Sequence, residues 1–220
     1  MKVDIKTLMD NIKNGNITGN VKDNTIITIS NTPGSGGDEI VEKLANRLNL
    51  EVFDKDIIKR FAEYSGADAD IFRMITENAA AVTKDFWWNR LFGKKSIDNN
   101  VIRRYLTNIM YTLARSGNCV IVGRGGHIPL SDVATMRIRI TGSKDKCIER
   151  IMASHDLSLS AATDEYNHRV ASSGKFVWDI FNSRLNDPIN FDLVINTDRI
   201  KSFDYCTDMI TTMIKHIKGK

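Results

Sequence analysis

The chain has 220 residues, of which 42% are hydrophobic and 26% are charged, and its formal net charge is +4. This length and apolar content suit one α/β domain, with or without an inserted lid, and argue against global disorder. The mild positive charge is compatible with anionic small molecules, but it does not by itself favour nucleic acid as a partner.

The three cysteines, Cys119, Cys147 and Cys206, are widely spaced and form no C-x-x-C pair. This usage predicts a reduced, cytoplasmic protein, with Cys119 and Cys206 as core fillers. No run approaches the ~20 apolar residues of a membrane span. Asp4 and Lys6 interrupt the N-terminal stretch where a signal peptide would need its apolar centre. We therefore expect no membrane partner.

Residues 1–24 are predicted to form an N-terminal amphipathic helix and a polar linker. Within residues 3–13, apolar residues recur at helical spacing, at Ile5, Leu8, Met9 and Ile12. Asn14-Gly15 ends this pattern. Packing of the helix on the main domain, residues 25–220, is favoured over a dimer contact, and a homodimer stays open.

The main domain alternates strand patterns with helix patterns. Strands are predicted at Thr25–Ser30, Leu50–Phe53, Cys119–Val122, Arg137–Thr141 and Leu193–Asn196. Helices are predicted near residues 38–48, 54–65, 68–82, 97–116, 143–154 and 200–217. Two strands are nearly continuous apolar runs, as expected when helices cover both faces of a parallel sheet. The predicted fold is therefore a doubly wound α/β domain of three layers, with ligands at the carboxyl ends of the strands.

A glycine-rich turn joins the first of these strands to the helix that follows it. Strand, glycine-rich turn and helix is an arrangement that cradles phosphates, because glycines let backbone N–H groups turn inward and the helix N-terminus adds partial positive charge. The residues expected to hold ATP-type phosphates are Asn31, Gly34, Ser35, Gly36, Gly37, Asp38 and Glu39.

This turn departs from the G-x-x-x-x-G-K-[ST] pattern. Asn31 stands at the first glycine, Gly37 at the lysine and Asp38 at the hydroxyl residue, whereas Gly36 fits. The usual cation and the usual magnesium ligand are therefore missing. Two roles are open for Asp38, as a Mg²⁺ ligand or as the N-cap of the helix, and capping is favoured.

Polar or glycine-rich residues also follow three other predicted strands. Asp54 ends the second strand, Gly123-Arg124 follow the third, and Asn196-Thr197 follow the fifth. The carboxyl ends of parallel strands share one edge of the sheet, so these residues are expected to converge with the glycine-rich turn.

Two segments fit the alternation poorly and are interpreted as covers over a site. Residues 83–96 concentrate aromatics and cations, and residues 155–190 are polar and hold several basic and aromatic side chains. Trp87 and Trp88 could stack a base, but packing of the cover onto the core is favoured. A nucleic-acid site at residues 86–104 predicts tight, salt-dependent binding and ranks last.

Five blocks of the sequence are familiar as a set: ITIS at 27–30, GSGG at 34–37, FDKDII at 53–58, CVIVGRGG at 119–126 and DPINFDLVINT at 187–197. In order and spacing they resemble the cytidylate kinase-like family of P-loop proteins, over about residues 25–215. The resemblance implies a nucleoside monophosphate kinase fold with a five-stranded parallel core and a lid at about 155–190. It also implies Mg²⁺-dependent transfer of the γ-phosphoryl group of ATP, which needs positioning and charge stabilisation.

The resemblance further implies roles for single residues. Gly34–Gly37 would wrap the β-phosphate, Arg124 would grip the monophosphate of the acceptor and help catalysis, and Asp54 would face the acceptor pocket. A planar guanidinium suits bidentate phosphate binding. The plainer alternatives are an exposed turn residue for Arg124 and an N-cap for Asp54. Gly125 replaces an acid that often helps to read cytosine, so base specificity is not implied.

Further catalytic cations are expected on the helices. By the same resemblance, Arg150 lies where this fold often carries a basic pair, although Cys147 replaces the arginine of that pair. The alternative role for Arg150 is an exposed ion pair. Arg169, Lys175 and Arg184 are the lid candidates, of which Arg169 is preferred as catalytic, and a solvated helix face is their alternative.

The predicted function is phosphoryl transfer from ATP to a small acceptor, with a nucleoside monophosphate favoured. The acceptor phosphate attacks in line and needs no general base because it is already ionised. The rival is a nucleotide-binding or sensing module with little catalysis, which the departures at Asn31, Asp38 and Cys147 motivate. A kinase predicts ADP release that depends on the acceptor, whereas a sensor predicts binding without turnover.

Overall fold

A computed structural model of the chain describes residues 24–64 and 98–219. Within them, five strands form one parallel sheet in the order β2-β3-β1-β4-β5. The strands are β1 Ile26–Asn31, β2 Glu51–Phe53, β3 Cys119–Val122, β4 Met136–Thr141 and β5 Leu193–Asn196. The predicted α/β fold with a five-stranded parallel sheet is confirmed.

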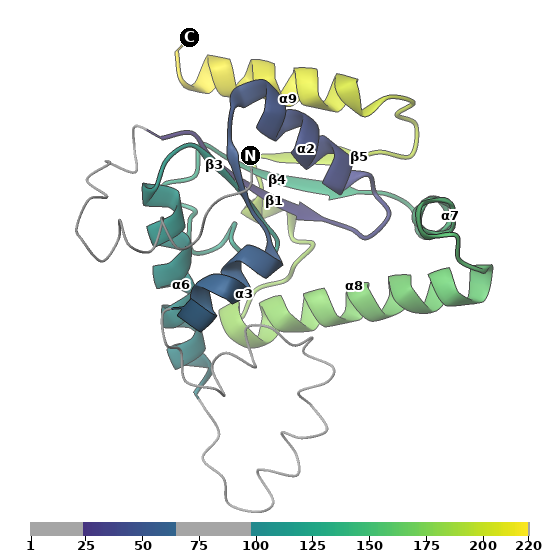
Figure 1. The fold of residues 1–220 in the computed structure, drawn as a ribbon, viewed down its shortest axis with the longest axis horizontal. Helices are drawn as coiled ribbons and strands as arrows, with labels where there is room; N and C mark the ends of the chain where they lie inside the picture. Colours follow the sequence, from purple (N-terminus) through teal and green to yellow (C-terminus); the bar gives the residue numbers. More distant parts are fainter. Residues whose placement is uncertain (1–23, 65–97, 220) are drawn as a thin grey trace, which may run out of the picture.

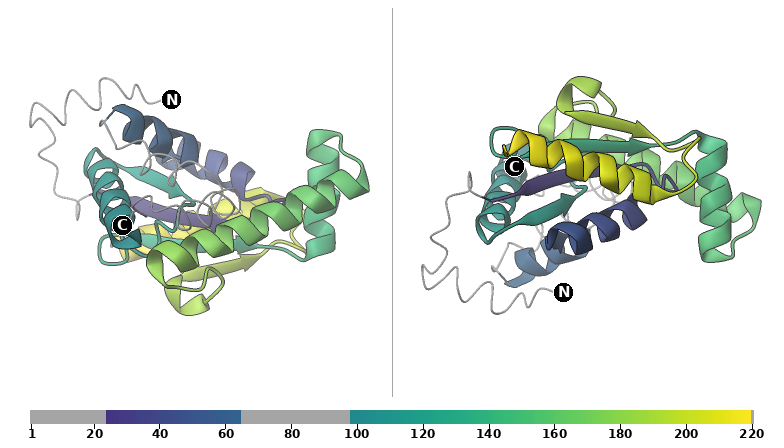
Figure 2. Two further views of the ribbon diagram at one scale, coloured as in Figure 1. Left: turned by 90° about the horizontal axis from the view of Figure 1, so that it is seen from below. Right: turned by 90° about the horizontal axis from the view of Figure 1, so that it is seen from above.

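Helices cover both faces of this sheet (Figure 1). α2 and α9 lie over one face, and α3, α6 and α8 lie over the other. Figure 2 shows α8 crossing the sheet in the view from below and α9 lying over it in the view from above. The helices are α2 Gly37–Leu48, α3 Lys55–Tyr64, α6 Asn99–Arg115, α7 Lys144–His155, α8 Leu159–Phe181 and α9 Phe203–Ile217, with a 3₁₀ turn η2 at Pro188–Asn190.

Strand β3 illustrates why the sequence holds unbroken apolar runs. Val120 is buried in the core beneath α2 and α9, whereas Cys119 and Ile121 are buried in the core beneath α6 and α8. Successive side chains of a strand point to opposite faces, so a strand covered on both sides can be apolar at every position. Cys119 and Cys206 are buried core residues, as predicted, and burial raises the pKa of the Cys119 thiol to about 12.

Several sequence predictions lie outside the described residues, namely the N-terminal helix, the helix at 68–82 and the aromatic cover at 83–96. Among the helices that the structure does describe, none is both long and apolar enough to cross a membrane.

The segment interpreted as a lid contains one long helix, α8, which was not among the predicted helices. Its C-terminal half buries Phe176, Val177 and Ile180 against α6 and the sheet, so this half belongs to the core. Its N-terminal half extends beyond the sheet together with α7 (Figure 1). A lid movement therefore remains a proposal for the outer half only.

Gly174 in α8 is a position where the sequence does not maximise stability. A Cβ atom added there would have no neighbour within 4 Å. We expect Gly174→Ala to raise the free energy of unfolding by about 0.5–1 kcal/mol, because alanine loses less backbone entropy in a helix. Chemical denaturation checks this, and a lower stability would contradict it.

Candidate functional site

The turn between β1 and α2, Thr32–Gly36, is here called the phosphate loop. It is tied to the sheet at both ends: Thr32 N donates to Ile140 O at 2.9 Å, and Ser35 O accepts from Thr197 Oγ1 at 2.9 Å. Gly34 and Gly36 have φ values of 76° and 78°, in the left-handed region that favours glycine. The loop thus turns back on itself at the carboxyl edge of the sheet, as predicted.

The N-terminus of α2 has no side-chain cap. The prediction that Asp38 caps this helix is wrong, because its exposed carboxylate accepts instead from Asn31 Nδ2 at 3.1 Å. The first-turn amides of a helix lack intrahelical acceptors and carry partial positive charge. Left without a side-chain cap, this end of α2 is suited to an anionic ligand.

Two of the departures from the P-loop pattern compensate each other. A Cβ atom on Gly37 would lie 2.4 Å from Cβ of Asn31. The asparagine therefore occupies the space where a side chain at position 37 would begin. Once residue 31 is not glycine, residue 37 has to be, and the loop loses its lysine for a steric reason.

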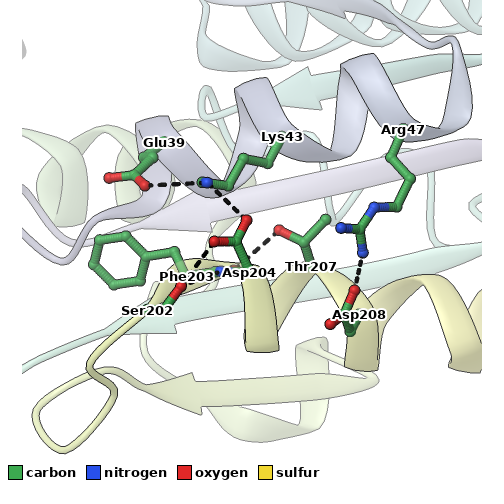
Figure 3. Close-up of polar contacts among 8 residues, drawn as sticks. All are labelled: Glu39, Lys43, Arg47, Ser202, Phe203, Asp204, Thr207 and Asp208. Carbon is green, nitrogen blue, oxygen red and sulfur yellow. Dashed lines mark hydrogen bonds and ion pairs between the residues drawn. The ribbon is translucent and has the colours of Figure 1, made fainter.

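The start of α9 closes one side of the loop. A Cβ atom on Gly36 would lie 2.0 Å from the Phe203 ring. Figure 3 shows how α9 is docked: Lys43 Nζ of α2 lies 2.7 Å from Asp204 Oδ1, and Arg47 pairs with Asp208. This docking keeps the aromatic ring against the loop.

Arg124 follows β3 at the same edge, in an unusual backbone conformation. Its φ of 50° is left-handed, as are those of its neighbours Gly123 (75°) and Gly125 (69°). Its guanidinium Cζ lies 5.0 Å from the centroid of the Phe176 ring, and burial lowers its pKa while Asp56 acts in the opposite direction. The alternative of an exposed turn arginine is wrong, because the side chain is partly buried and stacked.

Gly125 has a left-handed φ of 69°, and a Cβ atom there would lie 2.7 Å from the Phe181 ring of α8. The backbone conformation and the packing of α8 over the turn therefore both disfavour an acid at this position.

Asp54 caps α3, in agreement with its plainer interpretation. Its Oδ1 accepts from the backbone N–H groups of Asp56 (2.9 Å) and Ile57 (3.0 Å). A role in acceptor binding would have to use the other carboxylate oxygen and remains a proposal.

Arg150 braces the loop. Its Nη1 donates to Thr197 Oγ1 (3.0 Å) and Gly34 O (3.3 Å), and its Nη2 donates to Thr197 O (2.9 Å). Its Cζ also lies 5.6 Å from the centroid of the Phe203 ring. The alternative of an exposed ion pair is wrong: Arg150 links α7, the phosphate loop and the end of β5 through neutral partners.

The preferred lid cation is not brought to the loop by any contact in the described part of the chain. Arg169 Nη1 pairs with Glu165 Oε1 at 3.1 Å along α8. Lys175 makes the same kind of pair with Asp179, at 2.6 Å. Both behave as the solvated-face alternative predicted, and a catalytic role for Arg169 requires that its pair open.

Arg139, a charged residue buried in β4, was not among the site residues predicted from the sequence. Its side chain is 7% exposed. It donates to Ser30 Oγ at 3.1 Å, Thr32 Oγ1 at 3.0 Å and Asn186 Oδ1 at 2.8 Å. The available signal was the alternation of the strand, which places Arg139 on the face opposite to Ile138 and Ile140.

A cleft of about 680 Å³ opens beside α2 and β2 and shares Asp38 and Asp54 with the candidate site. Its lining includes the acids Asp38, Glu42, Glu51 and Asp54, and burial raises the pKa of Glu51. Carboxylates repel phosphate groups, so this cleft is a poorer phosphate site than the loop.

His127, on the turn after Arg124, provides a prediction about acid stability. It is 2% exposed, its ring centroid lies 4.5 Å from that of Phe191, and burial, then the nearby Arg139 and Arg137, lower its pKa from 6.5 to about 4. The unfolded chain therefore binds more protons than the native protein between these pH values, so the free energy of unfolding falls as pH falls from 6.5 to 4.

We expect this loss to approach about 3 kcal/mol, from the difference between the two pKa values. Denaturant unfolding from pH 7 to pH 4 should show a shallower pH slope in His127→Phe than in the unmodified protein. Identical slopes would show that His127 does not set this dependence.

The chain is similar in sequence to a family of nucleotide kinases. The profile of the cytidylate kinase-like family matches residues 26–199. The cytidylate kinase of Staphylothermus marinus is 25% identical, over 86% of this chain and 98% of that protein. The cytidylate kinase of Methanocaldococcus jannaschii is 27% identical, over 79% and 89%.

One solved structure agrees in fold. An uncharacterized protein from Eubacterium ventriosum has a TM-score of 0.63 at 22% identity, covering 87% of this chain and 98% of that one. Shikimate kinase from Bacteroides thetaiotaomicron is less similar, with a TM-score of 0.48 at 11% identity over the same shares of the two chains.

Proposed function

The chain belongs to the cytidylate kinase-like family, and from this premise we propose that it transfers the γ-phosphoryl group of ATP to a nucleoside monophosphate. The observation that carries the proposal is the uncapped, glycine-turned phosphate loop at the sheet edge where Arg124 also lies. The loop would supply amide donors for a polyphosphate, and Arg124 would supply a cation for a second phosphate group.

In this proposal the loop amides and the N-terminus of α2 bind the polyphosphate of ATP. Arg124 binds the phosphate of the acceptor, whose oxygen attacks the γ-phosphorus in line as the bond to the ADP oxygen breaks. The acceptor phosphate is already ionised, so no side chain has to remove a proton. The protein contributes position and charge neutralisation, which dominate in phosphoryl transfer.

Mg²⁺ would neutralise the phosphate oxygens when bound. It is commonly held by one or two carboxylates together with substrate phosphates. Asp38 and Glu39 are exposed carboxylates in the first turn of α2 and fit that mode. In the described residues, no three His, Cys, Asp or Glu side chains form a metal site of their own, so phosphate oxygens and water would supply the remaining ligands.

The second candidate is a nucleotide sensor of the same fold. The loop favours it because the usual lysine, a cation that promotes transfer, is absent, while the backbone amides of the loop can still bind phosphate. Such a module binds ATP and releases no ADP.

The test has two parts. Calorimetric titration with ATP, with and without Mg²⁺, measures binding. A coupled assay then measures ADP release with CMP, dCMP, UMP, AMP and GMP in turn. ADP release that depends on one of these acceptors supports the kinase. Micromolar ATP binding without turnover on any acceptor supports the sensor, and no binding up to millimolar ATP contradicts both.

A further inference from the structure

Arg139 is a buried cation that has no carboxylate partner among the described residues. Its hydrogen-bond acceptors are two hydroxyls and one amide oxygen. Taking a charge out of water costs several kcal/mol unless an opposite charge or a full set of hydrogen bonds offsets it. Burial lowers the pKa of Arg139 to about 10, while Tyr166 and Cys147 act in the opposite direction, and no carboxylate is among the groups that act on it.

Its neighbour on the same strand is a useful contrast. Arg137 makes a two-pronged ion pair with Asp192, through Nη2 at 2.6 Å and Nε at 3.2 Å. The pair is partly exposed and raises the pKa of Arg137. Arg139 is more deeply buried and lacks such a pair. Its guanidinium carries five N–H donors, of which the described hydrogen bonds use three.

The position of Arg139 relates it to the phosphate loop. In the β1–β4 register Arg139 is the partner of Ser30, and its side chain also bonds Thr32, the first residue of the loop. Ile138 and Ile140 pack beneath α2 and α9, so Arg139 points to the face covered by α8.

Arg124 lies on the same face, on the other side of β1. It follows β3, which pairs with β1 opposite to β4, and it stacks on Phe176 of α8. Two arginines, one from each neighbouring strand, therefore flank the end of β1 where the loop begins.

We propose that Arg139 is a second phosphate-binding cation of this site, which acts with Arg124 to neutralise a phosphoryl group held on the α8 face of the loop. A dianionic phosphate group would supply the negative charge that the described protein residues do not. The inference rests on the proposed function and deepens it, because it assigns a second guanidinium group to the dianionic phosphate that Arg124 binds.

The competing interpretation is structural, with Arg139 as a brace between β1 and Asn186. The two interpretations differ in the sign of a stability change. A brace destabilises the free protein when it is removed. If Arg139 is instead an uncompensated cation, replacing it with an apolar side chain of similar length leaves the stability of the free protein unchanged or raises it. The same replacement weakens anion binding.

The test uses inorganic pyrophosphate, which carries no base and requires no turnover. Calorimetric titration compares the unmodified protein with Arg139→Met, Arg139→Lys and the matched control Arg137→Met, which removes the same charge from the same strand. Thermal unfolding of each protein is recorded without the anion.

We expect Arg139→Met to weaken pyrophosphate binding by about tenfold or more with an unchanged or higher Tm, and Arg137→Met to leave the affinity within about twofold. If Arg139→Met does not fold, Arg139→Lys serves instead. We expect Arg139→Lys to lose less affinity for pyrophosphate, because lysine keeps the positive charge but lacks the planar guanidinium group.

Unchanged affinity in the variants, or no pyrophosphate binding by the unmodified protein, overturns the inference. Acceptor-dependent ADP release is measured separately. A protein that binds pyrophosphate through Arg139 yet releases no ADP with any acceptor keeps the inference and loses the proposed kinase. Turnover that is undiminished in Arg139→Met keeps the kinase and loses the inference.

Discussion

Replacing Arg124 with glycine is expected to lower acceptor-dependent ADP release by about a hundred- to a thousandfold, the usual effect of removing one preorganised donor to a developing charge. The same change should leave Tm unchanged or raise it. Arg124 has a φ of 50° between two left-handed glycines, and a side chain in that region costs about 1–2 kcal/mol. Glycine removes that strain together with a partly desolvated cation.

Opposite directions for activity and stability are the signature of a strained residue kept for function. Coupled kinetics and thermal unfolding of Arg124→Gly, Arg124→Ala and Arg124→Lys measure both. Arg115→Ala is the control, because this exposed arginine ends α6 at the opposite edge of the sheet. Activity lost only in proportion to stability would mean that Arg124 supports the turn and does not bind the acceptor.

Replacing Gly34 with alanine is expected to weaken ATP binding by at least about a hundredfold, because a displaced loop loses amide hydrogen bonds to charged phosphate oxygens, at about 1.5–3 kcal/mol each. The added Cβ atom would lie 2.2 Å from the carbonyl oxygen of Cys147. That neighbour is backbone and cannot rotate away, so the loop itself has to move. Left-handed strain adds to the overlap, and the combined loss of stability is about 3 kcal/mol.

The matched control for this substitution is Gly219→Ala. Gly219 has a φ of 67° and a Cβ atom there meets nothing within 4 Å, so this variant carries the backbone strain without the overlap. Titration with ATP and denaturant unfolding should show normal affinity in Gly219→Ala and lost affinity in Gly34→Ala. Equal affinities would contradict the assignment of the loop as the phosphate site.

Much of the fold was predictable because it is encoded locally. Apolar runs such as Cys119–Val122 and the helical periodicity of 38–48 and 200–217 predicted parallel strands covered on both faces, and this is confirmed. Sequence order also placed the loop and Arg124 at one sheet edge, because parallel strands end on the same side. The buried part of α8 was harder to recognise, since polar residues surround Phe176 and Val177.

Contacts between segments far apart in the chain could not be predicted in the same way. Asp38 is a residue type that often caps helices, yet its carboxylate accepts a hydrogen bond from Asn31, seven positions earlier in the chain. Arg150 was predicted to be catalytic because it is a cation near the site, yet its side chain donates hydrogen bonds to Thr197 and Gly34 and so braces the loop.

By itself, the sequence determined that this chain is a doubly wound α/β protein of the cytidylate kinase-like family with a glycine-rich turn after its first strand. Backbone preference and hydrophobic period act over a few residues and can be recognised without coordinates. The tertiary structure decided which charges face the loop. The environment of Arg139 is made by Ser30, Thr32 and Asn186, and only folding brings these residues together. Burial and charge pairing depend on distances in space, and these cannot be inferred from the separation of residues along the chain.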